Sequence, residues 1–545
     1  MQACYDNGIF WLNQVPDQKL SMLRESGWAY DEDRNAWGTR HADIAAEWFP
    51  KGSDSISLGV LDAYRTKEWN SRLALPNHMT ASEVMIRAAT PRTQTLRKYQ
   101  EAGIAALIQD GNKLLADDMG LGKTIQAIVA CNVLEPLKTL IVCPAAVKEN
   151  WRNELEKWST LHRTYSTAYG RETLSLEAQT IIINYDIFKD HIHALQEVEW
   201  DMVIIDEAQY LKTMDTQRTL AVLGTVKQPT LKAKKIIAMT GTPITNMPRD
   251  LYPVLKRLDY YGWGNLISFG RQFCGGHWEN RRVRGGEVIK TWIDTGSTQP
   301  EKLQDRLRST IMVRRVKSDA LPELPAKIRQ IISLEPDTKT AKLLKTERGL
   351  VQKSDLTYAE YTELAQTLTG EVPGFQDMAR IRREIGIIKM RIALPHLNEV
   401  IENNDKVIIF AHHVEIIQRL MIEFGYKATG IYGAVPPKQR VKNIYNFQND
   451  PDKRVFVGNI KAAGVGINLT AASVVIFLEH AWTPDATNQA EDRAHRMGQK
   501  DTVHVQHLVL KDSLDSYMVR TIIRKQEMID KIINQKKEEE NGSTD

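Results

Sequence analysis

The stretch LLADDMGLGKT, residues 114–124, indicates how this chain folds. Apolar residues come first, a turn with two glycines follows, and Lys123-Thr124 then opens an apolar helical stretch that runs to Leu134. A strand, a glycine turn and a helix beginning with Lys-Thr are typical of a phosphate-binding loop, in which backbone N–H groups face the phosphates. The strict pattern has glycine at position 117, where this chain has Asp, so the stretch by itself could also be an ordinary helix start.

Short apolar runs alternate with helical stretches along most of the chain, as in parallel α/β sheets. The first set covers residues 113–116, 139–143, 180–184, 202–205 and 235–239, and the second covers 406–410, 428–432, 454–458, 473–478 and 503–510. We therefore predict an α/β fold with two parallel sheets separated by a long helical insert. Ligands bind beyond the carboxyl ends of such strands, so the polar residues after each run are the candidate site residues.

Length and composition limit the class of protein. The 545 residues exceed the roughly 100–200 of one domain, so we expect two or more domains. With 42% hydrophobic and 26% charged residues the chain is not disordered as a whole, and 72 basic against 68 acidic residues exclude a histone-like cation. The start has no basic region and no apolar run approaches about 20 residues, which predicts an intracellular protein without a membrane segment. The four cysteines exclude a disulfide scaffold.

An acidic pair supports the reading of the loop. Asp206 and Glu207 follow the apolar run 202–205, which places both carboxylates at the mouth of a buried strand. Next to a phosphate-binding loop about 80 residues upstream, Asp206 would bind Mg²⁺ and Glu207 would polarise the attacking water. Lys123 would contact the β- and γ-phosphates, and the Thr124 hydroxyl would hold Mg²⁺. Thr240, Gly241 and Thr242 follow the run 235–239, where they could sense the γ-phosphate or simply form a turn.

A basic pattern in the second half suggests the rest of the site. We expect a helix from Thr483-Pro484 through Gln499, in which Gln489, Arg493 and Arg496 are spaced i, i+4, i+7 and share one face. Such a face is often only solvated. Two arginines after a strand could instead be arginine fingers that neutralise charge on a transferring phosphoryl group. Gly464 and Gly466 would let the backbone approach a nucleic-acid phosphate or a nucleotide.

These motifs in this order resemble those of superfamily II helicase-type ATPases of the Swi/Snf class. The resemblance covers about residues 91–515 and includes 99–100, 116–124, 143–144, 206–209, 240–246, 407–410, 464–469 and 489–499. The stretches 116–124 and 489–499 are most similar to those of the annealing-helicase, HepA-related branch. Residues 312–319 and 324–327 resemble the segment that joins the two lobes in this family.

The resemblance implies two RecA-like lobes that use ATP and Mg²⁺, with domain limits as follows. Residues 1–90 would be a small N-terminal domain, 91–335 the first lobe with a helical insertion at about 245–330, 336–530 the second lobe with a helical insertion at about 336–400, and 531–545 a tail. The nucleotide-binding residues it implies are Gln100, which would read adenine, Asp117, Asp118, Met119, Gly120, Leu121, Gly122, Lys123, Thr124, Gly466 and Gln489. Nucleic-acid contact or coupling would involve Pro144, Thr240, Gly241, Thr242, Lys461 and Gly464.

Two positions depart from the family pattern. The acidic motif of the family usually ends in His, whereas this chain has Gln209, a change that concerns coupling because Asp206 and Glu207 remain. The stretch 459–464 reads NIKAAG where STKAGG is common. Aspartate at position 117 is itself common in the family.

The resemblance implies a DNA-dependent ATPase that translocates on double-stranded DNA and acts on forks, branches or protein–DNA complexes in repair, replication or recombination. We expect a monomer, located in the cytoplasm or nucleoid of a bacterium or the nucleus of a eukaryote. A strand-separating helicase on DNA or RNA is an alternative in the same class. A nucleotide-gated scaffold without turnover is an alternative from another class, and the presence of Glu207, Arg493 and Arg496 argues against it.

Two segments lie outside these motifs. Residues 1–90 are rich in Trp, with a hairpin expected over 27–37 and a helix from Ala42, and we hypothesise that they select branched DNA or single-to-double-strand junctions. A packed domain that is structural or binds a protein partner is the alternative. Residues 270–290 carry Arg271, Arg281, Arg282 and Arg284 together with Gly275, Gly276, Gly285 and Gly286, which predicts a flexible basic loop.

Overall fold

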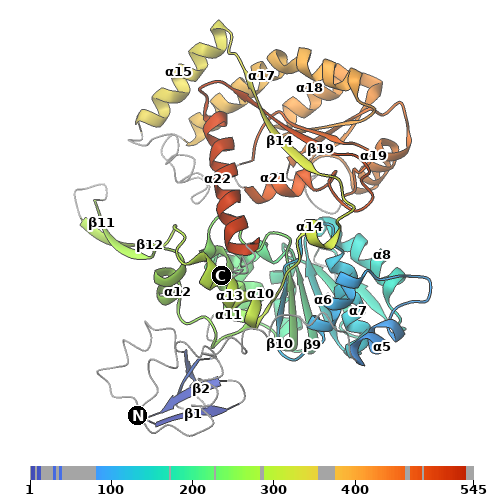
Figure 1. Ribbon diagram of the computed structural model, residues 1–545, viewed down its shortest axis with the longest axis vertical. Helices are drawn as coiled ribbons and strands as arrows, with labels where there is room; N and C mark the ends of the chain where they lie inside the picture. Colours follow the sequence, from blue (N-terminus) through green and yellow to red (C-terminus); the bar gives the residue numbers. More distant parts are fainter. Residues whose placement is uncertain are drawn as a thin grey trace, which may run out of the picture. The chain divides into compact units, whose positions relative to one another are not determined.

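The computed structural model describes residues 2–6, 9–13, 29–31, 36–39, 81–170, 174–225, 229–282, 288–353, 375–460, 467–481 and 484–534. These residues divide into two compact units (Figure 1). The first contains those within 2–118, 122–316 and 529–534, and the second those within 119–121 and 317–528.

A small antiparallel sheet lies at the N-terminus. Its strands are β1 (Gln2–Asp6), β2 (Ile9–Asn13), β3 (Ala29–Asp31) and β4 (Ala36–Thr39), in the order β1-β2-β4-β3. The hairpin expected over 27–37 is confirmed, because β3 pairs with β4 in an antiparallel register that joins Tyr30 to Trp37. The helix expected from Ala42 lies outside the described residues.

The first unit is built on a seven-stranded parallel sheet of order β13-β5-β10-β9-β6-β8-β7. Its strands are β5 (Lys113–Leu115), β6 (Thr139–Cys143), β7 (Tyr165–Thr167), β8 (Thr180–Asn184), β9 (Glu199–Asp206), β10 (Lys232–Met239) and β13 (Met312–Val313). All five apolar runs predicted for the first sheet are strands. Each is buried along its core portion because helices cover both faces.

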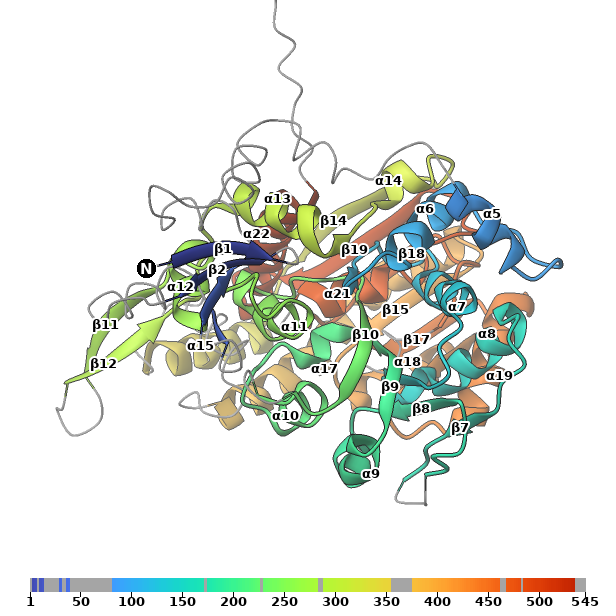
Figure 2. The same ribbon diagram turned by 90° about the horizontal axis from the view of Figure 1, so that it is seen from below.

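Helices lie on both sides of this sheet, with α5, α6 and α7 on one side and α10 and α11 on the other (Figures 1 and 2). The helices of the first unit are α5 (Ala81–Ala88), α6 (Lys98–Leu107), α7 (Lys123–Leu134), α8 (Lys148–Trp158), α9 (Ile192–Gln196), α10 (Gln217–Leu223), α11 (Tyr252–Leu258), α12 (Leu266–Phe273) and α13 (Pro300–Thr310). Short 3₁₀ turns are η1 (Ala145–Val147), η2 (Phe188–His191), η3 (Ala208–Leu211) and η4 (Pro248–Leu251).

The insertion expected to be helical also contains a β-hairpin. Strands β11 (His277–Arg282) and β12 (Val288–Ile293) pair antiparallel, so the expectation of a flexible basic loop over 270–290 was wrong for the residues in both strands. Trp278 and Trp292 lie directly opposite each other in this ladder, with ring centroids 5.3 Å apart. Such cross-strand aromatic pairs favour paired strands over a loop. Residues 283–287 between the strands are outside the described range.

The second unit is built on a six-stranded parallel sheet of order β14-β19-β18-β15-β17-β16. Its strands are β14 (Lys327–Leu334), β15 (Val407–Ala411), β16 (Ala428–Ile431), β17 (Val455–Asn459), β18 (Val474–Phe477) and β19 (Val503–Leu510). Its helices are α14 (Lys317–Ala320), α15 (Thr338–Lys353), α17 (Phe375–Asn403), α18 (Val414–Phe424), α19 (Pro437–Asn449) and α21 (Pro484–Glu491), and η5 (Gly425–Lys427) is a 3₁₀ turn. Helix α22 (Leu514–Asn534) follows β19.

The central strand β15 shows why this sheet is buried on both faces. Val407 and Ile409 pack in one core cluster with residues of α17 and α18. Ile408 and Phe410 point the other way and pack with residues of α19 and α21. Alternate side chains therefore enter different cores, which explains the continuous apolar run in the sequence.

The boundary between the two units comes earlier in the sequence than expected. We placed the boundary between the lobes at 335/336, whereas the structure places residues 317–334 in the second unit. The reason is β14, which pairs in parallel with β19 along its whole length, from Lys327 opposite Val503 to Leu334 opposite Leu510.

No helix within the described residues is both long enough and apolar enough to span a membrane.

Candidate active site

The glycine loop between β5 and α7 takes the conformation that its sequence predicts. Gly120 and Gly122 have φ angles of 84° and 76°, a left-handed region that residues with a Cβ atom adopt only with strain. A Cβ atom on Gly122 would lie 2.5 Å from Nε2 of Gln100, so the buried Gln100 side chain lies directly against this turn. Helix α7 begins immediately after the turn, at Lys123.

Lys123 lies close to both acidic segments of the first unit. Its ammonium donates to the carbonyl oxygens of Asp117 at 2.8 Å and Asp118 at 3.3 Å. Burial lowers the pKa of Lys123, and the carboxylates of Glu207 and Asp206 are among the charges that oppose this shift. The loop and the acidic pair, far apart in the sequence, therefore act on each other electrostatically.

Both aspartates at the start of the loop are held by arginines that follow β13. Arg315 forms a buried ion pair with Asp117, whose Oδ1 also accepts from Arg315 N and Nε, each at 2.9 Å. Gln126 donates to Asp117 Oδ2 at 2.9 Å, so both oxygens of this carboxylate are engaged. Arg314 pairs with Asp118 at 2.7 Å. The Asp117 side chain thus anchors the loop to the segment that follows β13.

Replacing Arg315 by Ala is expected to lower the free energy of unfolding of the first unit by about 3–5 kcal/mol, because it leaves the buried Asp117 carboxylate without its counter-charge. Chemical denaturation measures the loss. The control is Arg152→Ala, which removes an exposed pair with Glu156 and should cost under about 0.5 kcal/mol. Adding Asp117→Asn to Arg315→Ala should recover part of the loss. Equal stabilities of the Arg315 and Arg152 variants would contradict this account.

Asp206 ends strand β9 at the carboxyl edge of the sheet. Its Oδ2 accepts from Trp151 Nε1 at 2.8 Å, and its Oδ1 accepts from the Glu207 backbone N–H at 3.0 Å. Burial, followed by the adjacent Glu207 carboxylate, raises the pKa of Asp206 to about 7. A partly buried carboxyl with a raised pKa fits a divalent cation, whose charge would stabilise the ionised form.

Glu207 and Gln209 connect the acidic pair to the segment after β10. Glu207 has a φ angle of 52°, an uncommon value for a residue with a side chain and one that often marks a functional position. Gln209 donates from Nε2 to Glu207 Oε2 at 2.7 Å, and its Oε1 accepts from the Thr240 hydroxyl at 2.7 Å. Thr240 Oγ1 in turn accepts from Thr242 N at 3.0 Å. The glutamine that replaces the family histidine therefore bridges Glu207 to the 240–242 segment.

The arginines of the second unit lie together, but not on a helix. Helix α21 ends at Glu491, so the expectation of a helical face that includes Arg493 and Arg496 was wrong. The backbone N–H of Arg493 bonds three residues back, to Ala490, and its carbonyl accepts from Leu469 N at 3.0 Å. Arg493 Nη1 and Arg496 Nη1 nevertheless donate to the same acceptor, the Ile467 carbonyl, at 3.4 and 3.1 Å.

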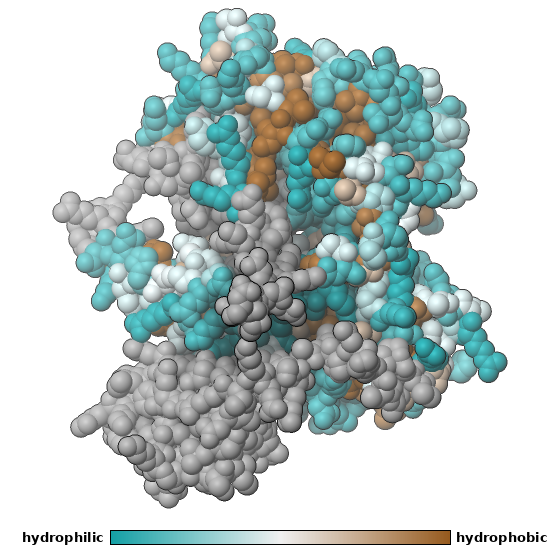
Figure 3. All heavy atoms as spheres, viewed as in Figure 1, coloured by the Kyte–Doolittle hydropathy of each residue, from teal (hydrophilic) through white to brown (hydrophobic). Residues whose placement is uncertain are grey.

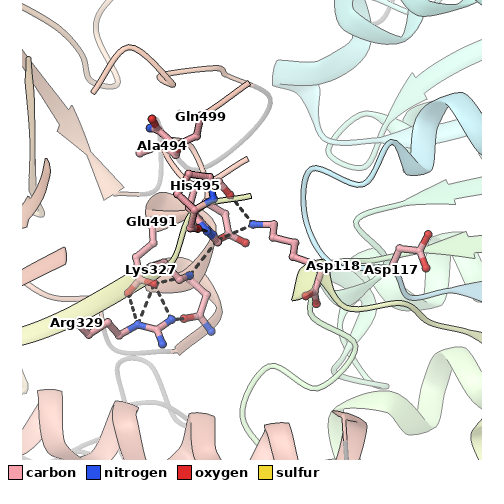
Figure 4. Close-up of polar contacts among 12 residues, drawn as sticks. Asp117, Asp118, Lys327, Arg329, Glu491, Ala494, His495 and Gln499 are labelled. Atoms are coloured by element: carbon pink, nitrogen blue, oxygen red, sulfur yellow. Dashed lines mark hydrogen bonds and ion pairs between the residues drawn. The ribbon is translucent and has the colours of Figure 1, made fainter. Parts of the chain in front are cut away.

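A buried network of ion pairs fixes the end of α21 (Figure 4). Glu491 pairs with Lys327 at 2.9 Å and with Arg329 at 2.6 Å. Asp492 pairs with Lys317 at 2.9 Å and with Lys327 at 3.0 Å, and Lys317 also donates to the His495 carbonyl at 2.6 Å. Burial alone would raise the pKa of Glu491, but Lys327 and Arg329 outweigh it and lower the value to about 2. These charges hold the turn that carries Arg493 and Arg496 against β14 and α14.

The remaining predicted residues have the following places. Gln489 is buried within α21, Pro144 follows β6 and precedes η1, and Gly241 is buried after β10. Met119 and Leu121 are buried side chains of the glycine loop, and Thr124 is the second residue of α7. Lys461, Gly464 and Gly466 lie outside the described residues.

Four side chains that position this site were not predicted from the sequence: Gln126, Trp151, Arg314 and Arg315. Asp117 and Asp118 are neighbouring carboxylates after a buried strand, where they require cations as partners. The neighbouring Arg314 and Arg315 could have been recognised in the sequence as these cations. No local pattern marks Trp151, because its partner Asp206 is 55 residues away along the chain.

Two family models match this chain. The model for the SNF2-related domain matches residues 28–378, and the model for the helicase conserved C-terminal domain matches residues 391–498. The chain therefore belongs to the SNF2-related family of helicase-like ATPases, as the motifs predicted.

Named relatives agree with this family. The DNA annealing helicase and endonuclease ZRANB3 of Mus musculus is 31% identical over 477 residues, which are 83% of this chain and 42% of that protein. The SWI/SNF-related matrix-associated actin-dependent regulator of chromatin subfamily A-like protein 1 homolog of Caenorhabditis elegans is 31% identical, over 81% of this chain and 62% of that protein. An uncharacterized ATP-dependent helicase of Mycoplasma pneumoniae is 30% identical, over 81% and 42%. The chain thus spans about two fifths to three fifths of these relatives.

Among solved structures, the SWI2/SNF2 ATPase core of Sulfolobus solfataricus in complex with dsDNA is 26% identical and covers 81% of this chain and 98% of that chain, with a TM-score of 0.38.

Proposed function

We propose that this chain is a DNA-dependent ATPase that translocates on double-stranded DNA and remodels forks, branches or protein–DNA complexes in repair, replication or recombination. The observation that carries the proposal is the convergence of Lys123, Asp206 and Glu207 at the carboxyl edge of one parallel sheet in a chain of the SNF2-related family. The names of its relatives, an annealing helicase among them, favour DNA as the substrate.

In this proposal the glycine loop between β5 and α7 binds the nucleotide. The N–H groups of the loop from Met119 to Gly122 and the start of α7 face the phosphates, and the Lys123 ammonium exchanges its carbonyl acceptors for phosphate oxygens. Gln100, which lies against Gly122, is placed beside the loop for a contact with the base.

Thr124 and Asp206 would hold Mg²⁺, which neutralises charge on the β- and γ-phosphates. Glu207 accepts a proton from the attacking water, and its carboxylate is oriented for this task by the hydrogen bond from Gln209. Gln209 also accepts from Thr240, so a movement of Glu207 would shift Thr240 as well. The 240–242 segment could respond in this way to the state of the nucleotide.

We assign to Arg493 and Arg496 the stabilisation of charge on the transferring phosphoryl group. Their shared acceptor at Ile467 and the ion-pair network behind them show that their backbone is fixed, which is what a preorganised cation requires. Gly466 and Gln489 are proposed to contact the nucleotide. Pro144, Gly241, Lys461 and Gly464 are proposed to contact DNA or to couple it to hydrolysis.

A motor that follows the DNA backbone makes mainly phosphate contacts, so its binding should be sensitive to salt and indifferent to sequence. We propose that the chain acts as a monomer and that residues 1–90 select the DNA structure.

A strand-separating helicase would differ from this motor by releasing single strands from a blunt duplex. A scaffold differs by lacking turnover.

The proposal is tested by measuring ATP hydrolysis in parallel with duplex DNA, single-stranded DNA, forked DNA and RNA, together with displacement of a triplex-forming strand from duplex DNA. We expect duplex and fork to stimulate hydrolysis, and triplex displacement to need ATP. Lys123→Ala is the matched inactive variant, because removing one charge-assisted contact should weaken ATP binding roughly 10- to 150-fold. Stimulation by RNA alone, or hydrolysis without triplex displacement, would exclude a duplex translocase.

A further inference from the structure

The β11–β12 hairpin carries an aromatic pair that takes no part in the site described above. The hairpin extends away from α12 and α13 of its own unit (Figures 1 and 2). Trp278 and Trp292 lie directly opposite each other in the ladder, and their rings meet edge to face with centroids 5.3 Å apart. Trp278 keeps 45% of its surface exposed. The pair therefore has one outer ring open to solvent.

The ring of Trp292, the inner one of the pair, packs against the backbone of two glycines. A Cβ atom on Gly276 would lie 2.4 Å from Cζ2 of Trp292, and one on Gly270, in α12, would lie 3.0 Å from the same atom. Two glycines thus leave the space that the Trp292 indole fills at the base of the hairpin. Because Trp292 is held in this way, the exposed Trp278 rests on a rigid support, which lowers the entropy cost of any contact it makes.

The surroundings of Trp278 are cationic rather than apolar. Lys290 lies two residues before Trp292 on the same face of the ladder, with its ammonium 5.9 Å from the centre of the Trp278 ring. Over residues 277–293 the sequence has three arginines and one lysine against two glutamates, an excess of two positive charges. The coloured part of the hairpin in Figure 3 is mostly teal and white, without a broad brown patch.

We propose that Trp278 stacks on an unpaired base of a DNA strand, with Lys290 beside it to contact the strand's backbone. An exposed indole next to a cation on a positively charged hairpin is the combination that single-stranded nucleic acid needs, since every base offers a face for stacking and every nucleotide a phosphate. A protein partner would favour a wider apolar surface than this single ring. The proposal rests on the proposed DNA function and adds a contact to bases that a backbone-tracking motor lacks.

The test compares binding of the full chain to a fork with unpaired arms and to a blunt duplex of equal length, by fluorescence anisotropy at one salt concentration without ATP. Trp278→Ala should weaken fork binding about 5- to 150-fold, the loss of one stacked base, and leave duplex binding within twofold. Trp278→Phe should restore most of the affinity because a phenyl ring still stacks. Ile289→Ala is the matched control, since Ile289 is also exposed but lies on the opposite face of the same hairpin.

A fluorescent adenine analogue in the unpaired arm gives a second readout. Its emission should be quenched on binding to the wild-type chain and to Trp278→Phe, but not to Trp278→Ala. Unchanged fork affinity in Trp278→Ala, an equal loss on blunt duplex, or a similar loss in Ile289→Ala would overturn the proposal. If the wild-type chain hydrolyses ATP without any response to DNA, while Trp278→Ala still loses fork binding, the proposed motor function fails and the stacking contact stands.

Discussion

Glu207→Gln is expected to reduce ATP turnover about 10²- to 10⁴-fold while ATP binding stays within a few-fold of wild type. The amide cannot accept a proton from the attacking water, but it keeps the length of the side chain and a polar group for the contact with Gln209. The unusual φ angle of Glu207 supports this assignment, because such a conformation is kept where the surroundings require it. Steady-state hydrolysis at saturating duplex DNA, together with equilibrium binding of a fluorescent ATP analogue, measures the two effects separately.

The matched control is Glu199→Gln, which makes the same chemical change at the exposed amino end of the same strand, β9. It should leave both hydrolysis and ATP binding unchanged. If Glu207→Gln hydrolyses ATP at the rate of Glu199→Gln, Glu207 is not the group that activates water. A parallel loss of ATP binding in Glu207→Gln would instead point to a structural role in the loop.

Arg493→Ala and Arg496→Ala should each lower DNA-stimulated hydrolysis by up to about 10³- to 10⁵-fold and change ATP affinity far less. The physical reason is that a cation aimed at the transferring phosphoryl group acts mainly on the charge that develops during transfer. The two guanidinium groups share one carbonyl acceptor, at Ile467, so we expect neither to replace the other fully. Pre-steady-state measurements with single and double variants test whether the two effects are additive.

Arg419→Ala is the control for this pair, because Arg419 is an exposed arginine of the same unit that pairs with Glu415 on the surface of α18. It should leave hydrolysis intact. Normal DNA-stimulated turnover in both Arg493→Ala and Arg496→Ala would mean that these arginines only stabilise the second unit. Their melting temperatures would then be lower than that of Arg419→Ala.

The sequence predicted ten of the thirteen strands in the two parallel sheets. Strands β6, β8 and β19 have the predicted limits, and the other predicted strands differ by one to three residues at an end. Continuous apolar runs identify strands that are buried on both faces, since burial leaves no polar position to break the run. Strands β7, β13 and β14 were missed. Most of β14 faces solvent at the edge of its sheet, and β13 and β7 have only two and three residues.

The helix expected through Gln499 shows where a periodic pattern misleads. Spacing of i, i+4, i+7 is compatible with a helix, but Glu491 and Asp492 form ion pairs with Lys317, Lys327 and Arg329 and the chain turns there. These partners lie about 160 residues or more away along the chain. Arg493 and Arg496 therefore do not share a helical face with Gln489, although both donate to the Ile467 carbonyl.

The sequence by itself determined the glycine loop between β5 and α7, the acidic pair and the family, because these depend on residues that are neighbours in the chain. The tertiary structure decided which groups surround them: Arg315 on Asp117, Trp151 on Asp206 and Gln209 between Glu207 and Thr240. It also turned a stretch expected to be a loop into a hairpin with an exposed Trp278. Ion pairs and hydrogen bonds between distant segments form only once parallel strands bring their carboxyl ends to one edge, and spacing along the chain does not encode which partners meet there.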